Sequence, residues 1–112
     1  MNNVVSENQR GIRAAFNSVV RGNTVSDNTL EGIDGDVNNM IEGNTIASNG
    51  GKGIQATSSL VKDNQIANNG GVGLELNSDS GYRENVIRGN TGGAVTGGVD
   101  LGGNLCNGLT TC

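Results

Sequence analysis

Apolar and polar positions along the chain follow a pattern that returns every 20 or 21 residues. Its most regular part is Asn-x-(Val/Ile)-x-x-Asn, in which two asparagines flank one β-branched residue. The five copies begin at Asn3, Asn23, Asn44, Asn64 and Asn85. Self-similarity at a fixed period is typical of repeat proteins, in which stacked units bury a core that one unit cannot bury alone.

Each repeat contains two further apolar sites. A Gly-(Ile/Leu) step follows the second asparagine, at Gly11-Ile12, Gly32-Ile33, Gly53-Ile54 and Gly73-Leu74. An apolar pair precedes the next repeat, at Val19-Val20, Met40-Ile41 and Leu60-Val61, with Tyr82 in the equivalent place of the fourth repeat. The segments between glycine and asparagine are too short for α-helices and rich in β-branched residues. The pattern therefore predicts three short strands in each repeat.

Three strands per repeat, stacked repeat on repeat, predict an all-β fold, a right-handed single-stranded parallel β-helix. We expect about five coils of 20–21 residues within residues 1–101, and a capping tail over residues 102–112. Because like residues lie above like residues, Val5, Val25, Ile46, Ile66 and Ile87 should form one aliphatic column. Ile12, Ile33, Ile54 and Leu74 should form a second column.

The asparagines and glycines are expected to be structural. Asn28, Asn49, Asn69 and Asn90 each follow a strand, where asparagine tolerates left-handed backbone and its amide can bond from coil to coil. The first asparagines of the repeats should form a second ladder of this kind. The glycines before the Gly-(Ile/Leu) strands are expected to make sharp corners.

Composition narrows the possible partners. The chain has 112 residues with 20 Gly, no Pro, His or Trp and 33% hydrophobic residues, which suits a narrow core. A net charge of −4 without a basic stripe argues against nucleic acid. No apolar run approaches the roughly 18 residues of a membrane span. The chain opens directly in repeat sequence without a secretory signal, so we expect it to be either cut from a longer parent or translated from an internal position.

Two cysteines lie near the end of the chain, Cys106 and Cys112. They are six residues apart in a Gly-, Asn- and Thr-rich tail, so they form either a small disulfide loop or two free thiols. A disulfide would imply an oxidising compartment. A zinc site is disfavoured, because two thiolates without histidine leave half of a tetrahedral site empty.

Candidate chemistry is confined to one outward row. Strand alternation turns Arg13, Asp34, Gln55 and Glu75 outward, and a later strand adds Asp100. These five residues are the ligand-binding candidates. Asp34 and Glu75 are two coils apart, about 10 Å, which is wide for two carboxylates acting on one glycosidic bond. A solvated sheet face is therefore favoured over a catalytic site.

Other kinds of site are weakly supported. Without histidine, a serine or cysteine nucleophile lacks its usual base. Residues 50–55 and 70–75 are similar to a calcium-binding Gly-Gly-x-Gly-x-Asp repeat, but Gln55 and Glu75 replace the aspartate and the period is not the 18 residues of that repeat. The sequence thus predicts no cofactor, with Ca²⁺ as the remaining alternative.

The repeat resembles that of the parallel β-helix superfamily of pectate lyases, alginate epimerases and periplasmic carbohydrate-binding proteins. Residues 23–28 and 44–49 carry the resemblance most clearly, and it extends from residue 3 to about 101. The tail resembles the C-terminal end of bacterial secreted members. The resemblance implies the C-terminal portion of a longer secreted, periplasmic or cell-surface β-helix. An Asp-Pro-His element, which the epimerases carry, is absent because the chain has no Pro or His.

Three functions remain open. The leading hypothesis is a non-catalytic β-helix module whose outer sheet face binds carbohydrate. The alternative is a polysaccharide lyase or hydrolase, truncated or complete, acting on an acidic polysaccharide through the outward row. The third is a structural module that forms a homo-oligomer through exposed coil ends, where Val5, Ile12 and Phe16 would lie in an open first coil.

Overall fold

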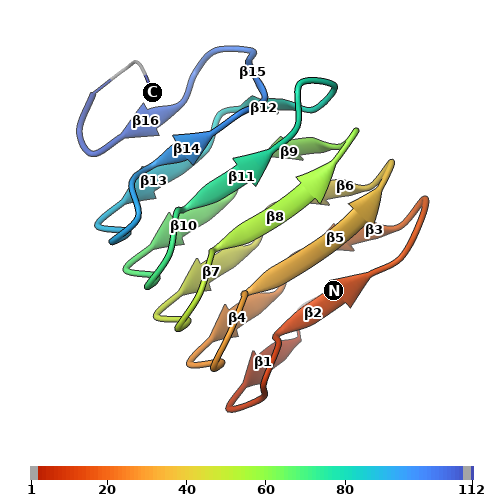
Figure 1. Cartoon of the computed structure of the whole chain (residues 1–112), viewed down its shortest axis with the longest axis vertical. Coiled ribbons are helices and arrows are strands. Elements are labelled where there is room, and N and C mark those ends of the chain that lie inside the picture. The colour runs from red at the N-terminus through yellow and green to blue at the C-terminus, as the bar shows by residue number, and fades with distance from the viewer. Residues whose placement is uncertain (1–2, 110–111) are drawn as a thin grey trace.

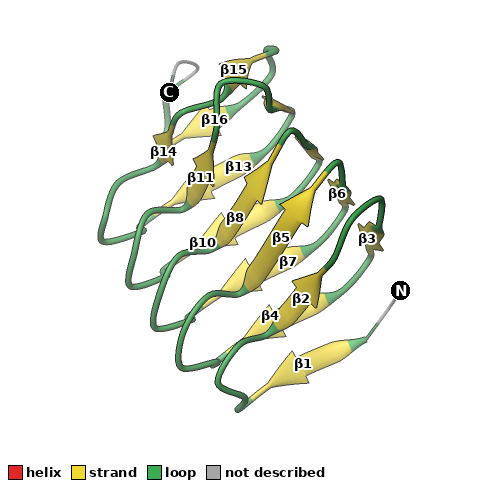
Figure 2. Cartoon of the chain, turned by 45° about the vertical axis from the view of Figure 1, so that its right-hand side comes forward, coloured by secondary structure: helices red, strands yellow, loops and turns green. Residues whose placement is uncertain are grey.

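The computed structural model describes residues 3–109 and 112, and its ordered elements are short strands joined by tight corners (Figure 1). Three parallel sheets wrap around one core (Figure 2). Sheet A contains β1 (Val4–Ser6), β4 (Thr24–Ser26), β7 (Thr45–Ala47), β10 (Gln65–Ala67), β13 (Val86–Arg88) and β16 (Leu105–Cys106). Sheet B contains β2 (Ile12–Ala14), β5 (Ile33–Val37), β8 (Ile54–Thr57), β11 (Leu74–Leu76) and β14 (Val95–Thr96). Sheet C contains β3 (Val19–Arg21), β6 (Met40–Glu42), β9 (Leu60–Lys62), β12 (Gly81–Arg83) and β15 (Val99–Asp100).

The predicted parallel β-helix is confirmed, with about five coils and three strands in each coil. Successive coils pair in register, so that Val5 lies beside Val25 and Ile46 beside Ile66. From Val25 to Ile87 the aliphatic column of sheet A is fully buried, and Cys106 continues it in the last strand. Sheet B buries Ile33, Ile54 and Leu74, and sheet C buries Ile41, Val61 and Tyr82. Each coil thus covers the apolar row of its neighbour.

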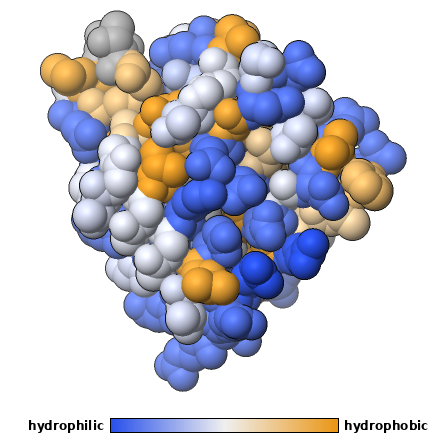
Figure 3. All heavy atoms as spheres, in the orientation of Figure 1, coloured by the Kyte–Doolittle hydropathy of each residue, from blue (hydrophilic) through white to orange (hydrophobic). Residues whose placement is uncertain are grey.

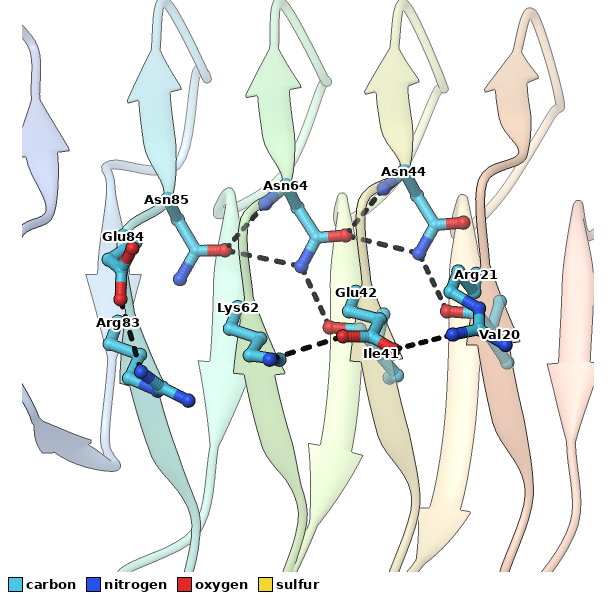
Figure 4. A network of polar contacts seen from close by, with 10 residues as sticks. All are labelled: Val20, Arg21, Ile41, Glu42, Asn44, Lys62, Asn64, Arg83, Glu84 and Asn85. Carbon is cyan, nitrogen blue, oxygen red and sulfur yellow. Dashed lines mark hydrogen bonds and ion pairs between the residues drawn. The ribbon is translucent and has the colours of Figure 1, made fainter. Parts of the chain in front are cut away.

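Two asparagine ladders run along the stack, as predicted. In one, Asn44 donates from its backbone N–H to Asn64 Oδ1 (2.9 Å) and from Nδ2 to the same oxygen (3.1 Å). Asn64 repeats both bonds to Asn85 (Figure 4). The other ladder joins Asn28, Asn49, Asn69 and Asn90 in the same way. Buried asparagine side chains therefore fill the corners of the core, where they are hydrogen-bonded from coil to coil.

The expectation that the ladder asparagines adopt left-handed backbone is wrong. The left-handed residue is the one before each asparagine, for example Asp27 (φ 57°) before Asn28 and Ser48 (φ 58°) before Asn49. A ladder asparagine must turn its amide into the corner and its N–H along the stack axis. The sharp turn therefore falls on the preceding residue, which faces solvent and includes glycine at positions 22, 43 and 89.

A third ladder precedes sheet C and mixes serine with asparagine. Ser18 donates its N–H to Asn39 Oδ1 (2.8 Å), and Asn39 donates its N–H to Ser59 Oγ (3.0 Å). Ser59 in turn donates its N–H to Ser80 Oγ (3.0 Å). Asn39 is buried, and its Nδ2 has no hydrogen-bond partner among the described residues, because the serine above it is too short to accept a second bond.

Replacing Ser59 by asparagine should stabilise the fold. The amide oxygen introduced by Ser59→Asn would accept both the N–H and the Nδ2 of Asn39, as Asn64 does for Asn44, and would add about 1 kcal/mol to the free energy of unfolding. Urea denaturation measures the change. Ser59→Ala is the control and should lose about 1 kcal/mol, because Asn39 N–H then loses its acceptor. A Ser59→Asn variant that is less stable than the parent contradicts the assignment.

The glycines of the Gly-(Ile/Leu) steps have a different role from the one expected. None of Gly11, Gly32, Gly53 and Gly73 has a positive φ, so they do not provide left-handed corners. They permit close stacking instead: a Cβ on Gly53 would lie 2.5 Å from both the Gly73 carbonyl oxygen and Ile66 Cγ2. The fifth position of this column is Ala94, whose carbonyl accepts the N–H of Leu74. Among the described residues, no further coil of sheet B follows Ala94, so a methyl group fits there.

Candidate functional site

The outward row predicted on sheet B is largely confirmed in its placement. Arg13 pairs with Asp34, Asp34 with Gln55, and Gln55 with Glu75, each in register. The placement of Asp100 in this row is wrong, since Asp100 lies in β15 of sheet C and the fifth residue of the row is Thr96. The reason is that residues 91–98 already contain the sheet B strand β14, so Gly98 leads into the next strand, β15.

Asp100 occupies an inward register position at the last strand of sheet C, beside Tyr82. Its Oδ1 accepts hydrogen bonds from Gly102 N–H (2.8 Å) and Asn104 Nδ2 (2.8 Å). Burial raises the pKa of the Tyr82 hydroxyl above its usual value, and the negative charge of Asp100 raises it further. Asp100 is exposed, and its two hydrogen bonds connect the turn after β15 to Asn104 at this end of the stack.

Most charged side chains around the sheet B row form ion pairs with one another. Arg10 Nε lies 3.5 Å from Glu31 Oε2 and 3.8 Å from Asp34 Oδ2. Lys52 Nζ lies 2.8 Å from Glu75 Oε1 and 3.0 Å from Gln55 Oε1. Hydrophilic residues cover the middle of this face (Figure 3). Asp34 and Glu75 are therefore engaged with cations of their own chain, which disfavours them as a general acid and base for a bound substrate.

Sheet C carries a groove of about 540 Å³ that the sequence did not lead us to expect. Its floor is a column of outward aliphatic side chains: Val19 (62% exposed), Met40 (38%), Leu60 and Leu101 (53%). Leu101 covers Gly81, where an added Cβ would lie 2.6 Å from its Cδ1. Leu101 thus supplies the apolar surface that Gly81 lacks.

The wall of the groove is the corner between sheets B and C. It presents Asn17, Asn38, Ser58 and Asp79, one polar side chain from each coil. Asn17, Asn38 and Ser58 adopt left-handed backbone (φ 58°, 62° and 46°). Asn38 Nδ2 donates to Asn17 Oδ1 (2.7 Å), which links two of the wall side chains. The groove therefore pairs an apolar floor with a mostly neutral polar wall.

A charged row lies beside the floor on the same face of sheet C (Figure 4). Arg21 Nη1 lies 3.5 Å from Glu42 Oε1, and Lys62 Nζ lies 3.3 Å from Glu42 Oε2. Glu42 thus pairs with cations of the coils on both sides. The cations next to the groove are consequently partnered by a carboxylate of the same row.

A sequence signal for the groove existed. Val19, Met40 and Leu60 are the first members of the apolar pairs, which we assigned together as one apolar site. Alternation allows only one member of each pair to face inward, and the buried member is Val20, Ile41 or Val61. Three outward aliphatic residues in register therefore follow from the pattern. Leu101 could not be added in this way, because its place over Gly81 depends on the course of the last coil.

A family model described as "Periplasmic copper-binding protein (NosD)" matches residues 1–99. The chain belongs to the NosD family. This parallel β-helix family agrees with the superfamily predicted from the repeat. No curated protein and no solved structure shows significant similarity to the chain.

The family name raises the question of whether the chain has a copper site. Copper is usually held by imidazole nitrogen, thiolate or thioether sulfur. The chain has no histidine, Met40 is the one methionine among the described residues, and both cysteines form a disulfide. Within residues 3–109 and 112, no three His, Cys, Asp or Glu side chains gather as a metal-binding group. The residues of this structure do not fit a copper site.

The disulfide between Cys106 and Cys112 is present, which resolves the alternatives left open by the sequence. NosD proteins are described as periplasmic, and a disulfide is stable in that oxidising compartment. A periplasmic or secreted location is thus consistent with both observations, and cell-surface display stays a prediction. No helix in the described part of the chain is long and apolar enough to cross a membrane.

Proposed function

We propose that the chain is a non-catalytic β-helix module that binds an extended, neutral glycan in the groove of sheet C. The observation that carries the proposal is the repetition of the groove. Three successive coils each supply one aliphatic floor residue and one polar wall residue, for example Met40 and Asn38 from the second coil. A ligand that repeats along the stack axis would meet the same pair of surfaces in each coil.

The chemistry of the two surfaces favours a sugar chain. Sugar rings present C–H groups on their faces, which suit Val19, Met40 and Leu60, and hydroxyl groups at their edges, which suit Asn17, Asn38 and Ser58. The paired floor and wall residues repeat with every coil, at a spacing of roughly 4.8 Å. An extended peptide repeats its side-chain direction after about 6.7 Å, which does not match the coils.

Charge favours a neutral glycan over an acidic one. The chain carries a net charge of −4, and Asp79 adds a carboxylate to the groove wall. The nearby cations Arg21 and Lys62 are engaged with Glu42. An acidic polysaccharide on the sheet B row, cleaved by a lyase or hydrolase, is the weaker alternative. Its candidate carboxylates Asp34 and Glu75 are in contact with cations and separated by the strand that carries Gln55.

Met40→Glu tests the groove. A charge in the middle of the apolar floor should weaken the binding of a neutral glycan at least tenfold, because a carboxylate must then be desolvated against the sugar. The fold should persist, since Met40 is 38% exposed. The measurement is calorimetric titration with neutral and acidic oligosaccharides. Methyl NMR of Val19, Met40 and Leu60 locates the bound ligand.

Gln55→Ala, on sheet B, is the matched control and should bind as the parent chain does. Two results would overturn the proposal. One is the absence of saturable binding to any neutral oligosaccharide in the panel. The other is binding that Gln55→Ala weakens and Met40→Glu does not, which would move the ligand to the sheet B row. Turnover of any bound polysaccharide would overturn the non-catalytic assignment.

A further inference from the structure

The dipeptide Asn-Gly occurs three times in the chain, at Asn49-Gly50, Asn69-Gly70 and Asn107-Gly108. In this dipeptide the glycine backbone nitrogen can approach the side-chain amide carbon of the asparagine, because the glycine has no side chain in the way. The first two copies belong to an asparagine ladder, whereas the third follows β16 at the C-terminal end of the stack (Figure 1). The fold therefore places one reactive sequence in two different environments.

We propose that Asn107 is a site of spontaneous deamidation and that the fold protects Asn49 and Asn69 from the same reaction. Asparagine is among the thermolabile residues of proteins. The Gly108 backbone nitrogen forms a bond to Asn107 Cγ, and the side-chain nitrogen leaves as ammonia with the proton that the Gly108 nitrogen loses. The product is a five-membered succinimide.

Water is the second reactant. It adds to one of the two carbonyl carbons of the succinimide, and the bond from that carbon to the ring nitrogen breaks. Attack at the former side-chain carbon gives aspartate, and attack at the backbone carbonyl carbon gives isoaspartate. The net change is an amide and water converted to a carboxylic acid and ammonia, so the reaction needs neither an oxidant nor a cofactor.

The turn after β16 leaves the reacting groups of Asn107-Gly108 free to approach each other. Cys106 N–H donates to the Leu109 carbonyl (2.7 Å), and Leu109 N–H donates to the Cys106 carbonyl (2.9 Å). The two residues between them have positive φ (52° and 82°), which is typical of a type I′ turn. Both are exposed, and a Cβ on Gly108 would meet no atom within 4 Å. Gly108 N–H donates to no acceptor within residues 3–109 and 112, so its nitrogen is available for attack.

One hydrogen bond prepares the amide of Asn107 for the reaction. Its Oδ1 accepts the backbone N–H of Gly89 (3.1 Å), which lies one coil below. Negative charge develops on Oδ1 while the nitrogen attacks Cγ, and a donor already in place stabilises that charge. The bond therefore favours attack, and it does not tie up the Gly108 nitrogen.

The two ladder copies are held away from the reactive geometry. Asn49 Oδ1 accepts two hydrogen bonds from Asn28, and Asn49 Nδ2 donates to Asn69 Oδ1. The nitrogens that would attack are also engaged, since Gly50 N–H donates to the Asn28 carbonyl (2.8 Å) and Gly70 N–H to the Asn49 carbonyl (2.8 Å). Both asparagines are buried. Reaction there requires a local opening that breaks several bonds between coils.

Isoaspartate at position 107 would change the end of the stack. It leads the main chain through the former side chain and adds one methylene group to the turn. A turn of two residues then no longer matches both bonds between Cys106 and Leu109. Either product also adds one negative charge to a chain whose net charge is −4. The turn after β16 should thus loosen irreversibly as the protein ages, while the coils below it stay intact.

The test is peptide mapping by mass spectrometry during incubation of the full chain at slightly alkaline pH. In the folded chain with its disulfide intact, Asn107 should convert at least about tenfold faster than Asn49 or Asn69, because only the ladder sites must first open. In concentrated urea with the disulfide reduced, the three sites should convert at rates within about threefold of one another, because the protection is lost. Chromatography of the peptides separates aspartate from isoaspartate.

Asn107→Gln is the control variant. Glutamine would have to close a six-membered ring, which forms more slowly, so the fast conversion should disappear while the rates at Asn49 and Asn69 stay unchanged. The proposal is overturned if either ladder site converts as fast as Asn107 in the folded chain, or if Asn107 stays intact as long as they do. It is also overturned if the three rates differ as widely in urea as in the folded chain, since neighbouring residues and not the fold would then set them.

Discussion

Replacing Asn49 by leucine should lower the free energy of unfolding by about 4 kcal/mol, close to the largest effects of single substitutions. Asn49 Oδ1 accepts the N–H (3.1 Å) and Nδ2 (2.9 Å) of Asn28, and its own Nδ2 donates to the Val25 carbonyl (3.2 Å) and Asn69 Oδ1 (2.9 Å). Leucine has nearly the same shape but removes these four hydrogen bonds and leaves the buried Asn28 N–H without its acceptor. Asn28 Nδ2 keeps its bond to the Val5 carbonyl, and Asn69 Oδ1 keeps the Asn49 N–H. The cost therefore combines one unpaired buried donor, about 1–3 kcal/mol, with the other lost bonds, each about 1 kcal/mol. Urea denaturation with the disulfide intact measures the loss.

Asn8→Leu is the matched control, since Asn8 belongs to the same column at its exposed end. The Asn8 side chain donates only to the Ser6 carbonyl (3.0 Å), and its backbone N–H, which bonds to Asn28 Oδ1, is retained in the variant. The free energy of unfolding of Asn8→Leu should fall by less than about 1 kcal/mol. Equal losses for Asn8→Leu and Asn49→Leu would show that the ladder contributes little beyond helping to form the corner.

Among substitutions that add a single methyl group, Gly53→Ala is expected to be the most destabilising. It should lower the free energy of unfolding by about 3 kcal/mol or more. The new Cβ would lie 2.5 Å from the Gly73 carbonyl oxygen and 2.5 Å from Ile66 Cγ2. The carbonyl accepts the N–H of Ile54, so it cannot move away without breaking a bond between coils (2.9 Å). Overpacking against backbone forces coils apart. Thermal unfolding followed by circular dichroism would show a lowered midpoint.

Gly35→Ala provides the same chemical change at a position that can accept it. Gly35 faces inward on sheet B in register with Ala14, and an added Cβ would lie 3.2 Å from the nearest atom, the Gln55 carbonyl oxygen. The expected change is within about 1 kcal/mol of the parent. If Gly53→Ala proves as stable as Gly35→Ala, close stacking is not the reason for the glycine column.

Binding and assembly depend on different parts of the molecule. The groove lies on the side of the stack, on sheet C, whereas self-association would use the ends of the stack. Association through the coil ends stays a prediction. Val4 (75% exposed) and Phe16 (63%) are exposed apolar residues of the first coil, and light scattering over a range of concentrations would detect self-association.

The sequence by itself determined the fold. The strict period places Val25, Ile46 and Ile66 in one column, and in-register parallel strands follow because a slip of one residue would turn these aliphatic side chains outward. The same periodicity predicted the asparagine ladders and the row that runs from Arg13 to Glu75. Each of these features repeats from coil to coil, so five copies of a short pattern reinforce one interpretation.

Only the tertiary structure decided the features that depend on one coil lying against the next. Asp100 could not be assigned to its sheet, because the last coil breaks the period and its strands shorten to two residues. In sequence, the glycine of the Gly-(Ile/Leu) step resembles a corner residue. Glycine is needed there because a Cβ would clash with a carbonyl oxygen of the next coil, about 20 residues away. The groove likewise needs Leu101 to fold over Gly81. Such contacts join residues that are distant in sequence, and local patterns carry no information about how closely they approach.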